Sequence, residues 1–436
     1  PGLPAPRWPP GAGVSSRIGG LLWQREFRLL WVGETTSQVG TAVTTVVMPL
    51  IAVTVLHVGA FAVGALEAAV WLPWLLIGLP AGAWVDRLAR RPLMLVCDGA
   101  SLVLLASVPV AAWFGVLSYP QLLLVALLAG ACGVFFQTAH EVFLPAMVAS
   151  GDLPEANAKV QGSEAAARIA GPGIGGLLAQ IFGAVTGLLA DAASFAVSAI
   201  CLLRIHADDP APVRGQRRSS LRTEIREGLR YAVTDPYLRP LIAYSAASNL
   251  TAGALQAIIV VFLVRTVGVG SATVGLLIAA ASIGGVVGAL LATRVARRFG
   301  TARAMLLAEA TAIPFVLLIP LTTRGPGLAL FVVGWLVSDA GITVSNVVIG
   351  SFKQSYVPRR LLGRVTTSMR FVSYGALPVG ALLGGMLASQ LGTRTGVWIA
   401  CGAQVLCVAI LLAGPIRKHR DLPSAGAPTP DFAHTP

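Results

Sequence analysis

Six carboxylic acids lie inside long apolar segments of the sequence, where a charged side chain finds few polar neighbours. An ionised acid at the centre of a membrane helix costs ~2.5–3.5 kcal/mol on insertion scales, so acids in such segments commonly form pairs or carry function. An acid that binds and releases a proton there could couple a proton gradient to the movement of another molecule. The six candidates are Glu34, Glu67, Glu141, Asp191, Glu309 and Asp339.

The depth of each acid within its apolar segment ranks it as a candidate for proton coupling. At ~1.5 Å per helical residue, Asp339 lies near the middle of its segment, while Glu34 and Glu309 lie nearer to one end, at depths comparable to each other. We expect Glu34 first and Asp339 second to couple protons or recognise a cation, with Glu309 and Asp191 as further candidates. The alternative is a structural hydrogen bond between helices, which is equally favoured for Asp191.

The other reactive side chains form no pattern typical of an enzyme or a metal site. No two of the five histidines are four residues apart, and the five cysteines show no CxxC spacing. No G-x-x-x-x-G-K-[ST] sequence for ATP is present. We therefore expect no catalytic residue, no metal and no cofactor, and we interpret the cysteines as packing residues.

The composition indicates which elements position the acids. The 436 residues are 55% hydrophobic and 12% charged, with a mean hydropathy of +0.77, whereas soluble proteins carry about 25% charged residues. Apolar runs of about 20 residues recur, each long enough to cross ~30 Å of hydrocarbon. We predict an all-α membrane protein with about twelve transmembrane helices, at 29–53, 62–85, 93–115, 121–144, 166–183, 185–204, 240–264, 272–294, 302–322, 327–350, 366–390 and 395–414.

The cations indicate the orientation of these helices. Of 32 Lys and Arg residues, 29 fall in the tails, in the loops that share their side or in the helix ends next to them, and the other three are Arg265, Arg324 and Arg394. The positive-inside rule therefore places both termini in the cytoplasm, with the chain in the cell (inner) membrane. Because the cations are spread over seven segments, they favour contact with membrane lipids and argue against nucleic acid binding.

Two local matches indicate an internal repeat. Arg87–Arg91 (RLARR) follows the second predicted helix, and Arg294–Arg298 (RVARR) follows the eighth, 207 residues later. Pro172 and Pro378, in the fifth and eleventh helices, are 206 residues apart. Folds built from two such copies bind substrate near the bilayer midplane between the halves.

The repeat predicts five regions. Two six-helix halves cover 21–204 and 240–415, and a polar central loop with a short amphipathic helix covers 205–239. The ends, 1–20 and 416–436, are predicted to be disordered cytoplasmic tails.

A motif of glycine, acid and arginines ends the second predicted helix. Residues 82–91 read GAWVDRLARR, which resembles the G-x-x-x-D-R-x-G-R-R signature of the major facilitator superfamily, with Ala89 in place of the last glycine. The glycine would allow a neighbouring helix to approach closely, and the acid could meet the positive end of another helix. We expect a cytoplasmic gate here; the alternative is arginines that only set topology. The gate residues would be Gly82, Asp86, Arg87, Arg90, Arg91 and Asp98.

A second glycine motif lies in the fifth predicted helix. Residues 171–176 read GPGIGG, which resembles the G-P-x-x-G-G motif. In the same superfamily this motif is associated with exporters. Glycines permit close packing and proline removes a backbone hydrogen bond, which favours a pivot. Ordinary packing of small residues is the alternative in a chain with 48 glycines. The pivot residues would be Gly171, Pro172, Gly175 and Gly176.

Further stretches resemble the macrolide-efflux and enterobactin-exporter branch of this superfamily, over about residues 24–415. They are FRLLW at 27–31, LPEANA at 153–158, DAASF at 191–195 and GRV at 363–365. The resemblance implies an exporter of drugs or siderophore-like compounds driven by proton antiport, with small-molecule substrates, protons and lipids as partners. We expect a monomer. The alternatives are a proton-coupled uptake permease, an integral-membrane enzyme acting on lipid intermediates, and a non-transporting sensor.

Overall fold

The computed structural model describes residues 20–85, 87–149, 151–206 and 221–423, and within these ranges it holds helices and connections but no strand. Eleven helices are long and apolar enough to cross a membrane, and a shorter apolar helix covers Ala60–Leu76. Together they occupy the twelve predicted segments. The prediction of an all-α membrane protein is confirmed.

Seven α-helices form the N-terminal part of the chain. They are α1 (Arg25–Leu50), α2 (Ala60–Leu76), α3 (Gly78–Val85), α4 (Arg90–Trp113), α5 (Tyr119–Met147), α6 (Leu153–Phe182) and α7 (Ala184–Arg204). A 3-10 turn, η2 (Gly20–Trp23), precedes α1, and a π-helical turn, η3 (Ile51–Val55), extends it. The second predicted segment is split into α2 and α3 at Ile77, between Pro73 and Gly78, because both residue types weaken a helix.

The C-terminal part contains seven further α-helices. They are α8 (Leu221–Thr234), α9 (Leu238–Val261), α10 (Ser271–Phe299), α11 (Thr301–Ala312), α12 (Leu328–Tyr356), α13 (Arg359–Leu391) and α14 (Thr393–Ala413). The π-helical η4 (Phe262–Val267) extends α9, and the 3-10 helix η5 (Ile313–Leu321) continues α11 past Pro314. Short 3-10 turns, η6 (Gly325–Gly327) and η7 (Pro415–Lys418), complete the set.

The predicted boundaries differ most from the structure at the fifth segment. The fifth segment was expected from residue 166, but α6 begins at Leu153. Residues 153–165 are too polar for a membrane run, yet Pro154 and Glu155 occupy the first turn, where proline and acids favour a helix start. The extra turns carry polar groups beyond the apolar part of the span.

Single glycines separate the last two helices of each half. Gly183, between α6 and α7, has φ +88°, and Gly392, between α13 and α14, has φ +87°. This left-handed region favours glycine, because other residues are strained there. The two turns lie 209 residues apart in sequence, close to the offsets of the predicted repeat.

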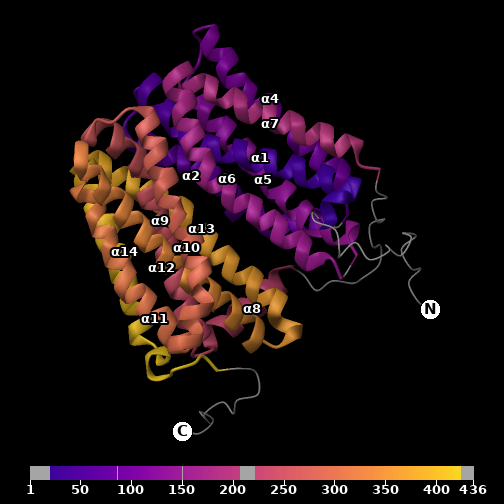
Figure 1. Ribbon diagram of the computed structural model, residues 1–436, viewed down its shortest axis with the longest axis vertical. Coiled ribbons are helices and arrows are strands. Elements are labelled where there is room, and N and C mark those ends of the chain that lie inside the picture. The colour runs from indigo at the N-terminus through magenta and orange to yellow at the C-terminus, as the bar shows by residue number, and fades with distance from the viewer. Residues whose placement is uncertain (1–19, 86, 150, 207–220, 424–436) are drawn as a thin grey trace.

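The helices form two groups in chain order, α1–α7 and α8–α14, which contact each other where α2 packs on α13 and α6 packs on α10. Within the first, α1 packs on α6 and α7, and α4 packs on α5 and α7; within the second, α13 packs on α9, and α10 and α11 pack on α12. Figure 1 shows the indigo-to-magenta group and the orange-to-yellow group converging at one end and diverging toward the chain termini. We propose these groups as the two copies of the repeat.

The apolar core explains this shape. One large buried cluster contains residues of both groups, among them Val47 and Ile51 of the first and Ile258, Phe262 and Phe331 of the second. We call the end of the molecule where this cluster lies the joined end. At the opposite end, which carries Gly20 and Pro423 and is called the termini end, each group has a separate cluster of its own.

The predicted C-terminal tail is partly wrong. Residues 416–423 pack against the second group, because Asp421 Oδ1 accepts from the backbone N–H of Thr301 (2.8 Å) and Leu422 N–H donates to Thr301 Oγ1 (2.8 Å). Asp421 thus caps the start of α11, where an acid is favoured. Residues 424–436 and 1–19 lie outside the described residues, as does most of the polar loop before α8.

Candidate functional site

The two groups meet at the joined end through backbone contacts between glycines. α6 crosses α10 at Gly176 and Gly275, where a Cβ on Gly176 would lie 2.6 Å from the Ser271 carbonyl oxygen. α2 crosses α13 at Gly64 and Gly385, where a Cβ on Gly64 would lie 2.9 Å from the Gly385 Cα. Neither crossing has room for a side chain, so the helices touch directly.

The GPGIGG motif of α6 takes part in this contact on two faces. Gly171 and Gly175 pack against α1, where a Cβ on Gly175 would lie 2.9 Å from the Val43 carbonyl oxygen. Gly176 packs against α10 of the other group. The motif therefore lies between a helix of its own group and a helix of the opposite one, which is where a pivot would act.

Three arginines stabilise the connections at the joined end. Arg265 Nη2 donates to the Val58 carbonyl across the two groups (2.8 Å). Arg324 donates to the carbonyls of Val267 (2.8 Å) and Gly268 (2.7 Å), and Arg394 donates to that of Thr322 (3.0 Å). These are the three cations that were predicted to lie on the face opposite the termini, and each donates hydrogen bonds to backbone carbonyl groups.

Toward the termini end the groups meet through polar and aromatic side chains. Glu141 of α5 and Arg370 of α13 form an ion pair between the groups at 3.3 Å. The Arg370 guanidinium also lies over the rings of Trp74 (6.0 Å) and Tyr374 (5.8 Å). A cavity of about 190 Å³ borders this contact, and Gly82 lines it.

The predicted gate motif is described only in part. Asp86 lies outside the described residues, and a Cβ on Gly82 would meet no described atom within 4 Å, so no described helix is in close contact there. Arg91 donates to the carbonyls of Leu202 (2.8 Å) and Leu203 (2.9 Å) at the end of α7, within its own group. Arg87 is exposed and Arg90 is buried.

Asp98, which was predicted to join the gate arginines, lies deep in the bundle, and its membership of the gate stays a prediction. Its side chain is completely buried, and neither carboxylate oxygen has a hydrogen-bond partner among the described residues. Asp98 follows Arg91 by seven residues, which places it on the same helix face but ~10.5 Å deeper in the bundle.

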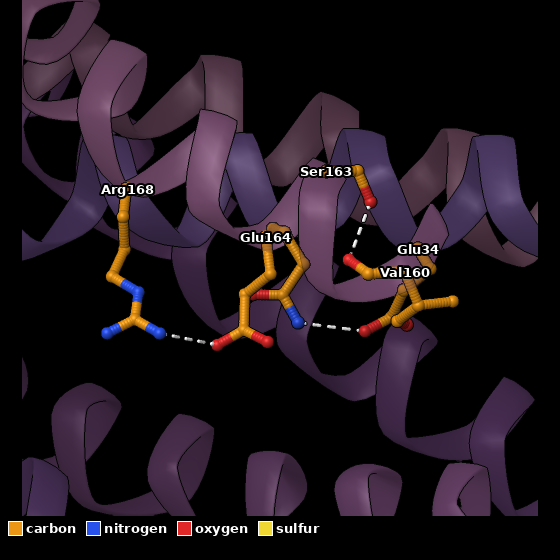
Figure 2. Close-up of polar contacts among 6 residues, drawn as sticks. Glu34, Val160, Ser163, Glu164 and Arg168 are labelled. Atoms are coloured by element: carbon orange, nitrogen blue, oxygen red, sulfur yellow. Dashed lines mark hydrogen bonds and ion pairs between the residues drawn. The ribbon is translucent and has the colours of Figure 1, made fainter. Parts of the chain in front are cut away.

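Glu34 lies on α1, against α6. It is 6% exposed; Gln38 Nε2 donates to its Oε1 (2.8 Å), and its Oε2 is buried without a partner. Figure 2 shows it beside the turn of α6 that holds Val160 and Ser163, with the ion pair of Glu164 and Arg168 (3.2 Å) nearby. One oxygen of Glu34 is thus available for a proton.

Asp339 lies on α12, half-buried against α10. A Cβ on Gly285 would lie 3.0 Å from its Oδ2, so the helix backbone is close to the carboxylate. Arg168 of α6, in the other group, attracts it electrostatically. Sequence reasoning did not select Arg168 or Glu164, although their i, i+4 spacing in a transmembrane helix was a usable signal.

Asp191 and Glu309 differ in their surroundings. Thr44 Oγ1 donates to Asp191 Oδ2 (2.5 Å) and Ser194 Oγ donates to Oδ1 (3.1 Å), so Asp191 links α7 to α1, as the structural alternative requires. Glu309 of α11 is completely buried, and neither of its oxygens has a partner among the described residues.

Comparisons with known proteins agree with this architecture. Residues 20–434 match the model of a family described as transmembrane secretion effector. The chain is 30% identical over 374 residues to the multidrug efflux pump Tap of Mycolicibacterium fortuitum, covering 82% of this chain and 87% of that one. It is 27% identical over 349 residues to an MFS-type transporter, y4rN, of Sinorhizobium fredii, covering 80% and 84%.

Solved structures share the fold. The nucleoside transporter NupG superposes with a TM-score of 0.70 at 12% identity, covering 90% of this chain and 99% of that one. A bacterial homologue of the iron transporter ferroportin superposes with a TM-score of 0.73 at 16% identity, covering 89% and 98%. The chain therefore belongs to the transmembrane secretion effector family of the major facilitator superfamily, and it is a multi-pass membrane transporter rather than an enzyme.

Proposed function

We propose that this transporter exports small apolar or amphipathic molecules, drugs among them, by proton antiport. The relatives named multidrug efflux pump, at 30% identity over most of both chains, support the substrate class. The GPGIGG motif, which resembles that of exporters, supports the direction. The substrate, the proton and the surrounding lipid are the proposed partners of a monomeric chain in the inner membrane.

The division of the apolar core into one shared cluster and two separate clusters is the main support for this proposal. One apolar cluster spans both groups at the joined end, and two separate clusters fill the termini end. This arrangement suits two bodies that rock about the joined end, which is how repeat-built carriers give alternating access. With both termini in the cytoplasm, as the cations favour, the diverging end would admit substrate from the cytoplasm.

The same geometry suggests a gate and a proton site. Glu141 and Arg370, together with Trp74 and Tyr374, would tighten when the termini end closes, in company with the arginines of residues 87–91. Glu34, with one unpartnered buried oxygen, is the first proton-coupling candidate. Asp339 is the second, because Arg168 reaches it electrostatically from the opposite group.

Reconstituted liposomes test this function. With an imposed proton gradient, we expect a cationic dye or a macrolide to move against the proton flow, and an uncoupler to stop it. Movement in the same direction as protons would favour the uptake permease instead. Substrate binding without either flux would favour a sensor, and turnover of a lipid intermediate would favour an enzyme.

Glu34→Gln tests the coupling residue. We expect it to abolish pH-driven export, because the amide cannot release a proton, while the protein still inserts and binds substrate. Glu155→Gln is the control: this acid of α6 is paired with Lys159 (3.5 Å), and its loss should leave coupling intact. Unchanged antiport in Glu34→Gln would remove Glu34 from the mechanism without affecting the proposal of export.

A further inference from the structure

Asp98 and Glu309 occupy equivalent positions in the two groups. Asp98 lies eight residues after Arg90, the first residue of α4, and Glu309 lies eight residues after Thr301, the first residue of α11. α4 and α11 are the third spanning helices of their groups. The two acids are 211 residues apart in sequence, close to the offsets of 206 and 207 between the repeat motifs.

Both acids are enclosed inside their own group rather than facing the space between the groups. Each side chain has 0% exposure, and all four carboxylate oxygens lack a hydrogen-bond partner among the described residues. No described Lys or Arg forms an ion pair with either within 4.0 Å. This distinguishes them from Asp191, which accepts from two hydroxyl groups.

The groups that face each acid carry no positive charge. Around Asp98 these are Glu34 of α1, Cys132 of α5 and Ser198 of α7. Two charged carboxylates at Glu34 and Asp98 would repel each other, and a single proton would remove that repulsion.

The neighbours of Glu309 have the same character. They are Tyr244 of α9, Ser345 of α12 and Cys407 of α14. The hydroxyl oxygens of Tyr244 and Ser345 are themselves buried without partners. Tyr244 stands 210 residues after Glu34, so the two sites also correspond in their first-helix neighbour, with a phenol in one group where the other has an acid.

An enclosed carboxylate without an ion pair is less stable charged than neutral, because the neighbouring hydroxyl groups repay only part of the loss of its hydration. We infer that Asp98 and Glu309 are a matched pair of proton-binding sites, one inside each half of the transporter, each holding its proton as a neutral carboxylic acid. This inference is independent of the substrate and of the direction of transport. Release of either proton would leave an unpaired negative charge inside the bundle. It therefore requires water or another hydrogen-bond donor to reach the carboxylate.

Infrared spectroscopy of the purified full chain in liposomes at neutral pH tests this inference. A protonated carboxylic acid in an apolar site has a carbonyl stretch well separated from that of a carboxylate. We expect Asp98→Asn to remove one such band and Glu309→Gln to remove another. Glu164→Gln, which alters an ion-paired acid, should remove none.

Isotope labelling provides the same test without a substitution, in case a variant does not fold. Carbon-13 in the aspartate carboxyls should shift the first band to lower frequency, and carbon-13 in the glutamate carboxyls should shift the second. The absence of a protonated-acid band from the unmodified protein would overturn the inference. So would bands that persist in Asp98→Asn and Glu309→Gln.

Discussion

The two ends of the interface between the helix groups are built from different kinds of contact. At the joined end, glycine backbones touch directly and an apolar cluster runs through both groups. Toward the termini end, one ion pair and three aromatic rings bridge them, and the paired side chains of Arg370 and Glu141 are 44% and 47% exposed. An exposed ion pair contributes ~0–1 kcal/mol, so this contact is easily broken.

The contact at the joined end can therefore act as a pivot, and the contact of Glu141 and Arg370 at the termini end, called the latch, can open and close. A contact without side chains keeps its distance while the helices rotate, because no rotamer must change. A contact made of a few weakly stabilised polar groups separates at little cost. We therefore expect substitutions at the joined end to have large effects on transport. Substitutions at the termini end should shift the equilibrium between its open and closed conformations.

Gly176→Ala should have the largest effect. Its Cβ would lie 2.6 Å from the Ser271 carbonyl oxygen and 2.8 Å from the Gly275 Cα, so backbone must move on α6 or α10. Overpacking of this kind costs ~1–3 kcal/mol, and we expect transport in liposomes to fall by about tenfold or more. Spin labels on α6 and α10 should report a wider separation at the joined end.

Gly173→Ala is the matched control for this substitution. It lies on the same helix three residues earlier, and its Cβ would be 3.5 Å from the Ala279 Cβ, an ordinary contact. Transport should stay within about twofold of the parent, since such a contact adds no strain. Equal losses in both variants would mean that the crossing at Gly176 is not special.

Arg265→Gln should have an intermediate effect. The arginine donates across the groups to the Val58 carbonyl (2.8 Å), and a hydrogen bond of this kind contributes about 1 kcal/mol. We expect thermal stability to decrease and the joined end to open more often, measured by labelling of a cysteine placed there. Arg324→Gln, whose partners Val267 and Gly268 lie in its own group, should destabilise without such opening.

The helices and the close packing of the glycines at 171–176 could be predicted from sequence because their signals are local. Apolar runs of spanning length are visible at any position in the chain, and the glycines of residues 171–176 lie at the crossings they were expected to allow. The break at Ile77 was also signalled locally, by Pro73 and Gly78, although the prediction treated that segment as continuous.

The contacts between the groups could not be predicted, because they join residues far apart in sequence. Glu141 and Arg370 are 229 positions apart, and nothing local marks Arg370 as its partner. The sequence identified Glu141 only as one of six acids in apolar segments. Asp98 is close in sequence to the gate arginines, which suggested a contact, and it lies two helical turns of rise from Arg91, so its place in the gate stays a prediction.

The ion pair between Glu141 and Arg370 should give the smallest effect and the sharpest test of the latch. Glu141→Gln removes the charge from a half-exposed pair, so we expect a loss of ~0.2–1 kcal/mol in the closed form, at most about a fivefold shift between conformations. Fluorescence or spin-label distances across α5 and α13 would measure it. Arg370→Gln should cost more, because it also removes the guanidinium from the rings of Trp74 and Tyr374.

A control pair within one group isolates the contribution of the latch. Glu227 and Arg364 also form an ion pair, but both belong to the second group, on α8 and α13. Glu227→Gln should therefore change stability slightly and leave the conformational balance unchanged. If Glu227→Gln shifted the distance between α5 and α13 as much as Glu141→Gln, the effect would reflect general loss of charge rather than a bridge between the groups. A shift confined to Glu141→Gln would identify the termini end as the side of the interface that opens.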